Sequence, residues 1–159
     1  MMSWTNWTNW KIWICWKNKS PQTNPIQDSN LIVKVVAAVF QSDNKYLACR
    51  RKAGLSNGGL WEFPGGKQNP DESPAQALLR EIKEELTVTP VIGESLGTSI
   101  HHYENKTIEL HCMFVSQWQG DFVPVDHDML EWFSLDALSQ LPLSEADVPF
   151  IERIKSRLN

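Results

Sequence analysis

The sequence predicts an α/β fold in which helices enclose a mixed β-sheet, formed by one domain at residues 28–159. Two observations predict this fold. Segments rich in β-branched and aliphatic residues are interspersed with two amphipathic helical patterns between residues 31 and 158. The chain of 159 residues is 42% hydrophobic, which is enough for a single core. It holds no apolar run long enough to span a membrane, so we expect no membrane partner.

The first half of the domain predicts three strands and a turn. Residues 31–40 form the first strand, residues 42–45 a turn, and residues 46–51 the second strand. A short strand at residues 60–63 leads into Phe63-Pro64-Gly65-Gly66. The glycines of this turn let the backbone approach a ligand closely.

A helix follows, and its start is clearly marked. Ser73 is a good N-cap, Pro74 fits the first helical position, and Gln76 completes a capping-box pattern. The apolar residues after this start recur at helical spacing and predict a stripe that faces the core. They are Ala75, Leu78, Leu79, Ile82 and Leu86.

The second half predicts two paired strands, a further strand and a closing helix. Residues 91–102 and 107–118 form the pair, which turns around Glu104-Asn105. Residues 130–134 form the next strand, and residues 149–158 the closing helix. This helix is expected to turn four apolar side chains inward: Phe150, Ile151, Ile154 and Leu158.

Acidic side chains gather on the first helix. Glu81, Glu84 and Glu85 are three and four residues apart, so they share one side of the helix. Like charges at this spacing cost helix stability unless a cation lies among them. Hard oxygen donors of this kind suit Mg²⁺ or Mn²⁺, and a backbone carbonyl of the turn at residues 63–66 could be one more ligand. The alternative interpretation is a solvated acidic helix face.

The stretch GKQNPDESPAQALLREIKEELTV resembles the Nudix box, the signature motif of the Nudix hydrolase family. The positions that match are Gly66, Glu72, Arg80, Glu81, Ile82, Glu84, Glu85 and Val88. Thr87 departs from the motif, which has glycine there. A left-handed turn at a β-branched residue costs roughly 1–2 kcal/mol, so we expect Thr87 to change the helix exit and leave the ligands untouched. The resemblance covers about residues 31–157 and implies the Nudix α/β/α sandwich.

The resemblance also implies a Mg²⁺-dependent hydrolase, with Mn²⁺ as an alternative metal. One to three ions would be held by Gly65, Glu81, Glu84, Glu85 and Asp126. Either Glu81 or Glu84 would accept the proton of the attacking water. Arg80 would orient Glu81 or pair with Glu72. For Asp126, the alternative is an ordinary loop aspartate.

Four residues are candidates for binding the substrate. By similarity to MutT-type proteins, Arg51 meets phosphate; the alternative is a surface arginine at a strand end. Lys67 would steady phosphate or a carboxylate, and Phe63 is a candidate to face the base. Asp147 would read the base as an ionised hydrogen-bond acceptor. Its alternative role is to cap the helix ahead of Pro149.

The MutT resemblance implies a nucleotide-pool enzyme that cleaves a nucleoside triphosphate to the monophosphate and pyrophosphate. We place 8-oxo-dGTP slightly ahead of CTP and 5-methyl-dCTP, and a catalytically inactive nucleotide-binding module is the third alternative. A net charge of −4 argues against nucleic acid as a partner. Three scattered cysteines suggest reduced thiols and a cytoplasmic location. We expect a monomer or a homodimer.

Residues 1–27 differ from the rest of the chain. Trp4, Trp7, Trp10, Trp13 and Trp16 recur at every third residue, a period that fits neither a helix nor a strand. The segment carries three lysines and no acid, so its charge is +3. Because the whole chain has a net charge of −4, the remaining residues carry −7. It could serve as an interfacial or partner-binding tag, since tryptophan favours membrane boundaries. We favour the alternative, a low-complexity extension and linker outside the fold.

Overall fold

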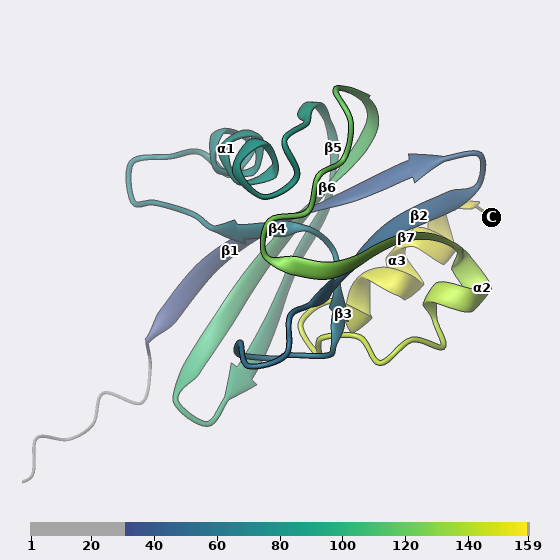
Figure 1. Ribbon diagram of the computed structural model, residues 1–159. Helices are drawn as coiled ribbons and strands as arrows, with labels where there is room; N and C mark the ends of the chain where they lie inside the picture. The colour runs from purple at the N-terminus through teal and green to yellow at the C-terminus, as the bar shows by residue number, and fades with distance from the viewer. Residues whose placement is uncertain (1–30, 159) are drawn as a thin grey trace, which may run out of the picture.

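The computed structural model describes residues 31–158, which fold around one mixed β-sheet (Figure 1). The sheet runs in the order β3-β2-β1-β6-β5, with β4 paired to β1 and β7 paired to β2. Only β1 and β6 are parallel; every other paired strand among these residues is antiparallel. The strands are β1 (Ile32–Ser42), β2 (Lys45–Arg51), β3 (Trp61–Glu62), β4 (Gly65–Lys67), β5 (Thr89–Tyr103), β6 (Lys106–Gln119) and β7 (His127–Ser134). The predicted mixed sheet is confirmed.

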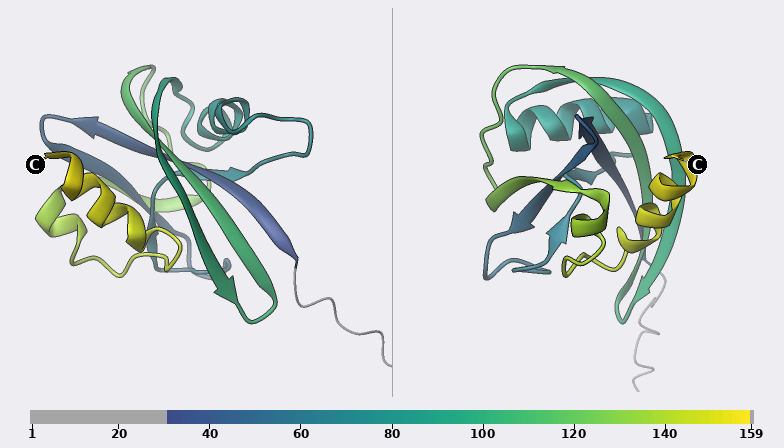
Figure 2. Two further views of the ribbon diagram at one scale, coloured as in Figure 1. Left: turned by 180° about the vertical axis from the view of Figure 1, so that it is seen from behind. Right: turned by 90° about the vertical axis from the view of Figure 1, so that its right-hand side faces the viewer.

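Helices cover both faces of this sheet, which confirms the predicted α/β/α sandwich (Figure 2). Side chains alternate across β1: Val36, Ala38 and Phe40 pack toward α1 (Pro74–Leu86), whereas Ala37 and Val39 pack toward α3 (Val148–Leu158). A short helix, α2 (Leu135–Leu138), joins the α3 layer. Because β1 is buried on both faces, it reads as a continuous apolar run.

The start and the end of α1 follow the local sequence. Ser73 and Gln76 form the reciprocal capping box, and Pro74 opens the helix. Thr87 ends it at φ 62°, the left-handed conformation that the motif's glycine would adopt without strain. The Thr87 hydroxyl donates a hydrogen bond to the Asp121 carbonyl at 3.0 Å, which offsets part of that strain.

The burial of the helices corrects two details of the predicted stripes. On α1, Ala75 and Leu79 are exposed and Ala77 is buried instead, because the buried stripe runs along Leu78, Ile82 and Leu86 at spacing of four. On α3, Phe150, Ile151 and Ile154 are buried as predicted. Leu158 is 60% exposed because the last turn extends beyond the sheet-facing core.

Two elements were not predicted. β4 was expected to be part of a glycine turn, yet Gly65, Gly66 and Lys67 pair with β1 opposite Ala37, Val36 and Val35. A Cβ atom at Gly65 would lie 2.0 Å from the Val36 carbonyl oxygen, so only glycine allows this approach. The one-turn helix α2 is held by its Ser134 N-cap.

The tryptophan-rich segment lies outside the described residues, and its interpretation stays a prediction. If it forms no part of the fold, a chain that begins at residue 28 should keep the melting temperature and the activity of the full chain. Circular dichroism melting and a turnover assay on both chains measure this. A melting temperature several degrees lower in the shorter chain would mean that the segment docks on the domain.

Candidate active site

A cavity of about 570 Å³ opens between β4, α1 and the loop that precedes α3. It collects residues that are far apart in the sequence. Seven of the predicted site residues line it: Arg51, Phe63, Gly65, Lys67, Glu81, Glu85 and Asp147. Arg80, Glu84 and Asp126 lie outside its lining, and Asp126 is exposed.

Arg80 is the centre of a charge network on α1. Its guanidinium binds both carboxylate oxygens of Glu72, at 2.6 and 2.8 Å. It also donates to Glu81 at 2.8 Å, to Glu84 at 3.2 Å and to the Lys67 carbonyl at 3.0 Å. The hydrogen bonds from Arg80 lower the pKa of Glu72 to about 2. Arg80 thereby ties the helix to β4 and draws carboxylates toward itself.

Gly66 explains how Glu81 reaches the cavity. A Cβ atom at Gly66 would lie 2.3 Å from a carboxylate oxygen of Glu81. The missing side chain therefore lets the Glu81 carboxylate lie directly against the backbone of β4. Its side chain is only 14% exposed.

The three helix carboxylates share one side of α1 but differ in exposure. Arg80 holds Glu81 and Glu84, and the Glu84 side chain is 61% exposed. Within residues 31–158, no three His, Cys, Asp or Glu side chains form a ready-made metal-binding group. The positive charge of Arg80 compensates the negative charges of Glu81 and Glu84. Arg80 makes no such contact with Glu85.

The buried carboxylate of Glu85 is the group that most clearly fits a cation. One of its oxygens is buried and lacks a hydrogen-bond partner among the described residues. Burial raises the pKa of Glu85 to about 7, opposed by His127 and reinforced by Glu81, Glu62 and Asp126. A hard divalent ion would supply the missing partner to this oxygen, so the donor set fits Mg²⁺ or Mn²⁺.

Asp147 lies in the opposite wall of the cavity, directly before α3. It is 4% exposed, and its carboxylate accepts a hydrogen bond from the Phe63 backbone amide at 3.1 Å. Burial raises the pKa of Asp147 to about 8, although the Phe63 amide and the Ser144 hydroxyl act in the opposite direction. The raised pKa favours the protonated form of Asp147, whereas we expected an ionised group. The Asp147 carboxylate thus binds the backbone amide between β3 and β4.

Glu62 lines the cavity and His127 contacts Glu62 from behind, and neither residue was identified from the sequence. Glu62 lines the cavity and contacts both Arg51 and the buried ring of His127. Strand alternation could have pointed to Glu62, because Trp61 and Phe63 are core residues and the residue between them faces the other way. No sequence pattern joins His127 to this site.

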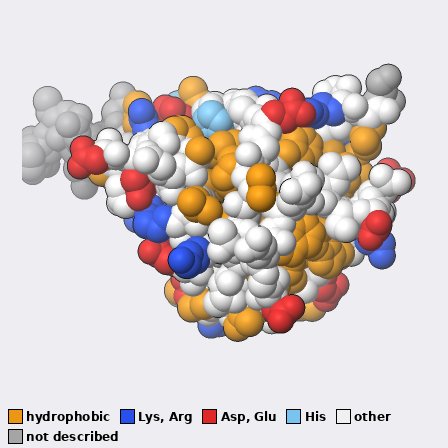
Figure 3. Space-filling view, turned by 90° about the horizontal axis from the view of Figure 1, so that it is seen from above, with side chains coloured by type: hydrophobic (Ala, Val, Ile, Leu, Met, Phe, Trp, Pro, Cys, Tyr) orange, Lys and Arg blue, Asp and Glu red, His pale blue; other side chains and the backbone are white. Residues whose placement is uncertain are grey.

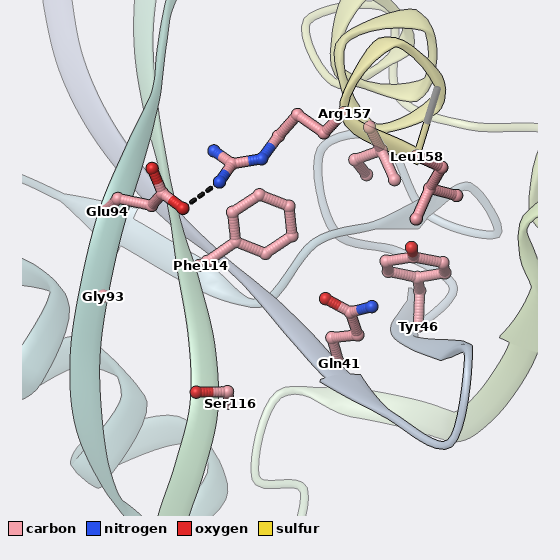
Figure 4. Close-up of a pocket in the computed structure, with 9 residues that line it drawn as sticks. Gln41, Tyr46, Gly93, Glu94, Phe114, Ser116, Arg157 and Leu158 are labelled. Atoms are coloured by element: carbon pink, nitrogen blue, oxygen red, sulfur yellow. Dashed lines mark hydrogen bonds and ion pairs between the residues drawn. The ribbon is translucent and has the colours of Figure 1, made fainter.

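Two smaller cavities contain none of the predicted residues. One, of about 330 Å³, lies at the C-terminal end of α3, where Arg157 pairs with Glu94 and stacks over Phe114 (Figure 4). The other, of about 450 Å³, adjoins the stacked rings of Trp118 and Trp132. On the face seen in Figure 3, acidic and basic side chains are interspersed. Within the described part of the chain, no helix is both apolar and long enough to cross a bilayer.

A family model described as NUDIX domain matches residues 35–153. The chain is 39% identical over 121 residues to a CTP pyrophosphohydrolase of Escherichia coli K12, covering 76% of this chain and 90% of the relative. It is 29% identical over 120 residues to an 8-oxo-dGTP diphosphatase of the same organism, covering 76% and 93%.

Solved structures similar to this fold include proteins related to those sequences. The solution structure of the E. coli ORF135 protein matches with a TM-score of 0.73 and 38% identity, covering 80% of this chain and 91% of that one. A MutT protein from Methanosarcina mazei Go1 matches with a TM-score of 0.74 and 27% identity, covering 82% and 97%.

Proposed function

The chain belongs to the Nudix hydrolase family, and from that premise we propose that it is a Mg²⁺-dependent pyrophosphohydrolase of nucleoside triphosphates. The products would be a nucleoside monophosphate and pyrophosphate. One observation carries the proposal: a single cavity joins the partnerless oxygen of Glu85 and the carboxylate of Glu81 to Arg51 and Asp147. Anionic ligands for a cation thus lie beside groups suited to phosphate and to a base.

The acidic residues would bind the metal and activate water. Glu81, Glu84 and Glu85, with the Gly65 carbonyl and Asp126, would hold the divalent ions. When bound, such an ion neutralises triphosphate charge and makes water a better nucleophile. Glu81 is the better placed of the two candidate bases, because it lines the cavity and Glu84 does not.

The remaining groups would position the reactants. Arg80 keeps the Glu81 carboxylate in place through the 2.8 Å hydrogen bond, and it is itself fixed by Glu72 and the Lys67 carbonyl. Arg51 and Lys67 supply positive charge for the phosphates from the cavity wall. These contacts orient the reacting groups before the chemical step.

The protonation state of Asp147 bears on the choice of base. A protonated carboxyl group both accepts and donates a hydrogen bond, which matches the amino group and N3 of cytosine. An ionised carboxylate only accepts, which matches N1–H and the amino group of guanine and 8-oxoguanine. The raised pKa of Asp147 favours the first of these patterns, so we propose cytidine nucleotides ahead of 8-oxo-dGTP. The similarity to a CTP pyrophosphohydrolase supports this order.

Oxidised guanine nucleotides are the second candidate. Several similar proteins, including those of Escherichia coli and Proteus vulgaris, are 8-oxo-dGTP diphosphatases. An Asp147 that ionises on substrate binding would suit that base. The inactive-module alternative has no support from the site, because all four acidic box residues are present and connected to Arg80 or the cavity.

A panel of nucleotides tests the proposal. CTP, 5-methyl-dCTP, dGTP and 8-oxo-dGTP are incubated with the full chain and Mg²⁺, and pyrophosphate release is measured. We expect the highest kcat/KM for the cytidine compounds and no release in the presence of EDTA. Preferred cleavage of 8-oxo-dGTP would overturn the cytidine assignment, and absence of cleavage across the panel would overturn the enzymatic proposal.

Replacing Asp147 by alanine tests its role in base reading. Each hydrogen bond of a neutral carboxyl group is worth roughly 0.5–1.5 kcal/mol, so loss of two should shrink the preference among bases by about fivefold to a hundredfold. KM for the preferred nucleotide should rise, while turnover at saturation changes less because the phosphate groups bind elsewhere. The measurement is kcat/KM for the same four nucleotides. An unchanged ranking would remove Asp147 from the substrate site.

A further inference from the structure

We propose that Glu62 is a positioning residue, which holds the Arg51 guanidinium in the orientation that meets the triphosphate. The inference rests on the proposed function, because it assumes that Arg51 binds phosphate. Glu62 is not part of the motif at Gly66–Val88, and it comes from β3, away from the acidic helix. Its task is therefore distinct from that of the helix carboxylates.

The contacts of Arg51 fix its side chain at two points. Its Nη1 donates to Glu62 Oε1 at 2.8 Å, and its Nε donates to the Ser56 carbonyl at 2.9 Å. Among residues 31–158, no protein atom accepts a hydrogen bond from Nη2. The planar guanidinium is thus held from one side and keeps hydrogen-bond donors free for a ligand in the cavity.

Glu62 is itself held from behind. His127, whose side chain is 1% exposed, contacts the same Oε1 through Nε2 at 3.0 Å. A carboxylate oxygen can only accept, so this contact assigns the proton to Nε2 of His127. The side chain of Glu62 is 14% exposed. A rigid, mostly buried acceptor of this kind restricts the rotamers of its arginine partner, which is what a positioning role requires.

Glu62 has a second, opposing effect on any anionic ligand. Its negative charge repels phosphate, and this repulsion acts whether or not Arg51 is present. Positioning, in contrast, acts only through Arg51. The two effects therefore separate in a double-mutant cycle, where Glu62 is changed in the presence and in the absence of Arg51.

The experiment compares wild type, Glu62→Gln, Arg51→Gln and the double variant. For each protein, kcat and KM are measured with the preferred nucleotide, and binding of tripolyphosphate with Mg²⁺ is measured by calorimetry. Loss of a charge-assisted contact should raise KM and the tripolyphosphate Kd about tenfold or more in Arg51→Gln, and comparably in Glu62→Gln. In the Arg51→Gln background, Glu62→Gln should have no further effect or tighten binding. The kcat should change less than KM throughout.

Asp128→Asn is the matched control. Asp128 pairs with Arg50, the neighbour of Arg51 on β2, at 2.8 Å, and neither residue lines the cavity. Breaking this pair should leave KM and tripolyphosphate binding unchanged. If Glu62→Gln does not fold, Glu62→Asp replaces it, since the shorter side chain keeps the charge but withdraws the contact.

Several results would overturn the inference. If Glu62→Gln tightens tripolyphosphate binding while Arg51 is present, charge repulsion is the only effect of Glu62. If Glu62→Gln weakens binding equally with and without Arg51, Glu62 acts independently of Arg51. Absence of tripolyphosphate binding by wild type would remove the anion site altogether. Failure of the proposed function looks different: no nucleotide is cleaved, yet the tripolyphosphate cycle still shows the coupling.

Discussion

Replacing Glu84 by glutamine should lower turnover of the preferred nucleotide by about a thousandfold or more, since metal-ion activation supplies several kcal/mol of transition-state stabilisation. The fold should survive the change. The Glu84 side chain is 61% exposed, and its ion pair with Arg80 is 3.2 Å long. Pairs of this exposure contribute at most about 1 kcal/mol. The large loss of activity would therefore come from the ligand role and not from unfolding.

Turnover with Mg²⁺ and calorimetric binding of Mn²⁺ are the two measurements. Glu152→Gln is the control, because it makes the same charge change on α3, where Glu152 pairs with Lys155 at 2.8 Å outside the cavity. The control should keep full activity and ion binding. Near-normal turnover and unaltered Mn²⁺ binding in Glu84→Gln would contradict the assignment of Glu84 as a ligand.

Elements with strong local signals were predictable from the sequence. The capping box at Ser73 and the stripe through Leu78, Ile82 and Leu86 identify α1 because each signal acts within a few residues. The turn at residues 42–45 is equally local, with positive φ angles at Asp43 and Asn44. β4 escaped prediction because two of its three residues are glycines, which pair with β1 only through a close backbone approach.

The candidate site divides in the same way. The box identified Arg80 and its acidic partners because their spacing along one helix already places them together. The contact between Glu62 and His127 joins residues that are 65 positions apart, so it depends on how β2 pairs with both β3 and β7. The burial of Asp147 also could not be predicted from the sequence. The sequence shows that Asp147 is acidic, whereas its protonation state depends on surroundings that only the fold creates.

That protonation state leads to a prediction about stability. Burial raises the pKa of Asp147 from 3.8 to about 8, so between these values the unfolded chain loses the proton first. The favourable contribution of the protonated group is complete below about pH 4 and is lost as the pH rises toward 8. Asparagine keeps the acceptor for the Phe63 amide but cannot ionise. The stability of Asp147→Asn relative to wild type should therefore increase as the pH rises from 4 to 8.

Urea unfolding of both proteins at intervals from pH 4 to pH 8 measures this difference. The unfolding free energies of the two proteins should separate as the pH rises above 4. Burial also raises the pKa of Glu85, to about 7, but Glu85 is present in both proteins and affects both free energies alike. Asp128→Asn is a suitable control, because the hydrogen bond from Arg50 lowers the pKa of that exposed carboxyl group. Ionised Asp128 stabilises the folded protein at high pH and loses this effect as the pH falls. Asp128→Asn should therefore not become more stable relative to wild type at pH 8. Parallel curves for wild type and Asp147→Asn would mean that folding does not raise the pKa of Asp147, and this argument for cytidine nucleotides would then fail.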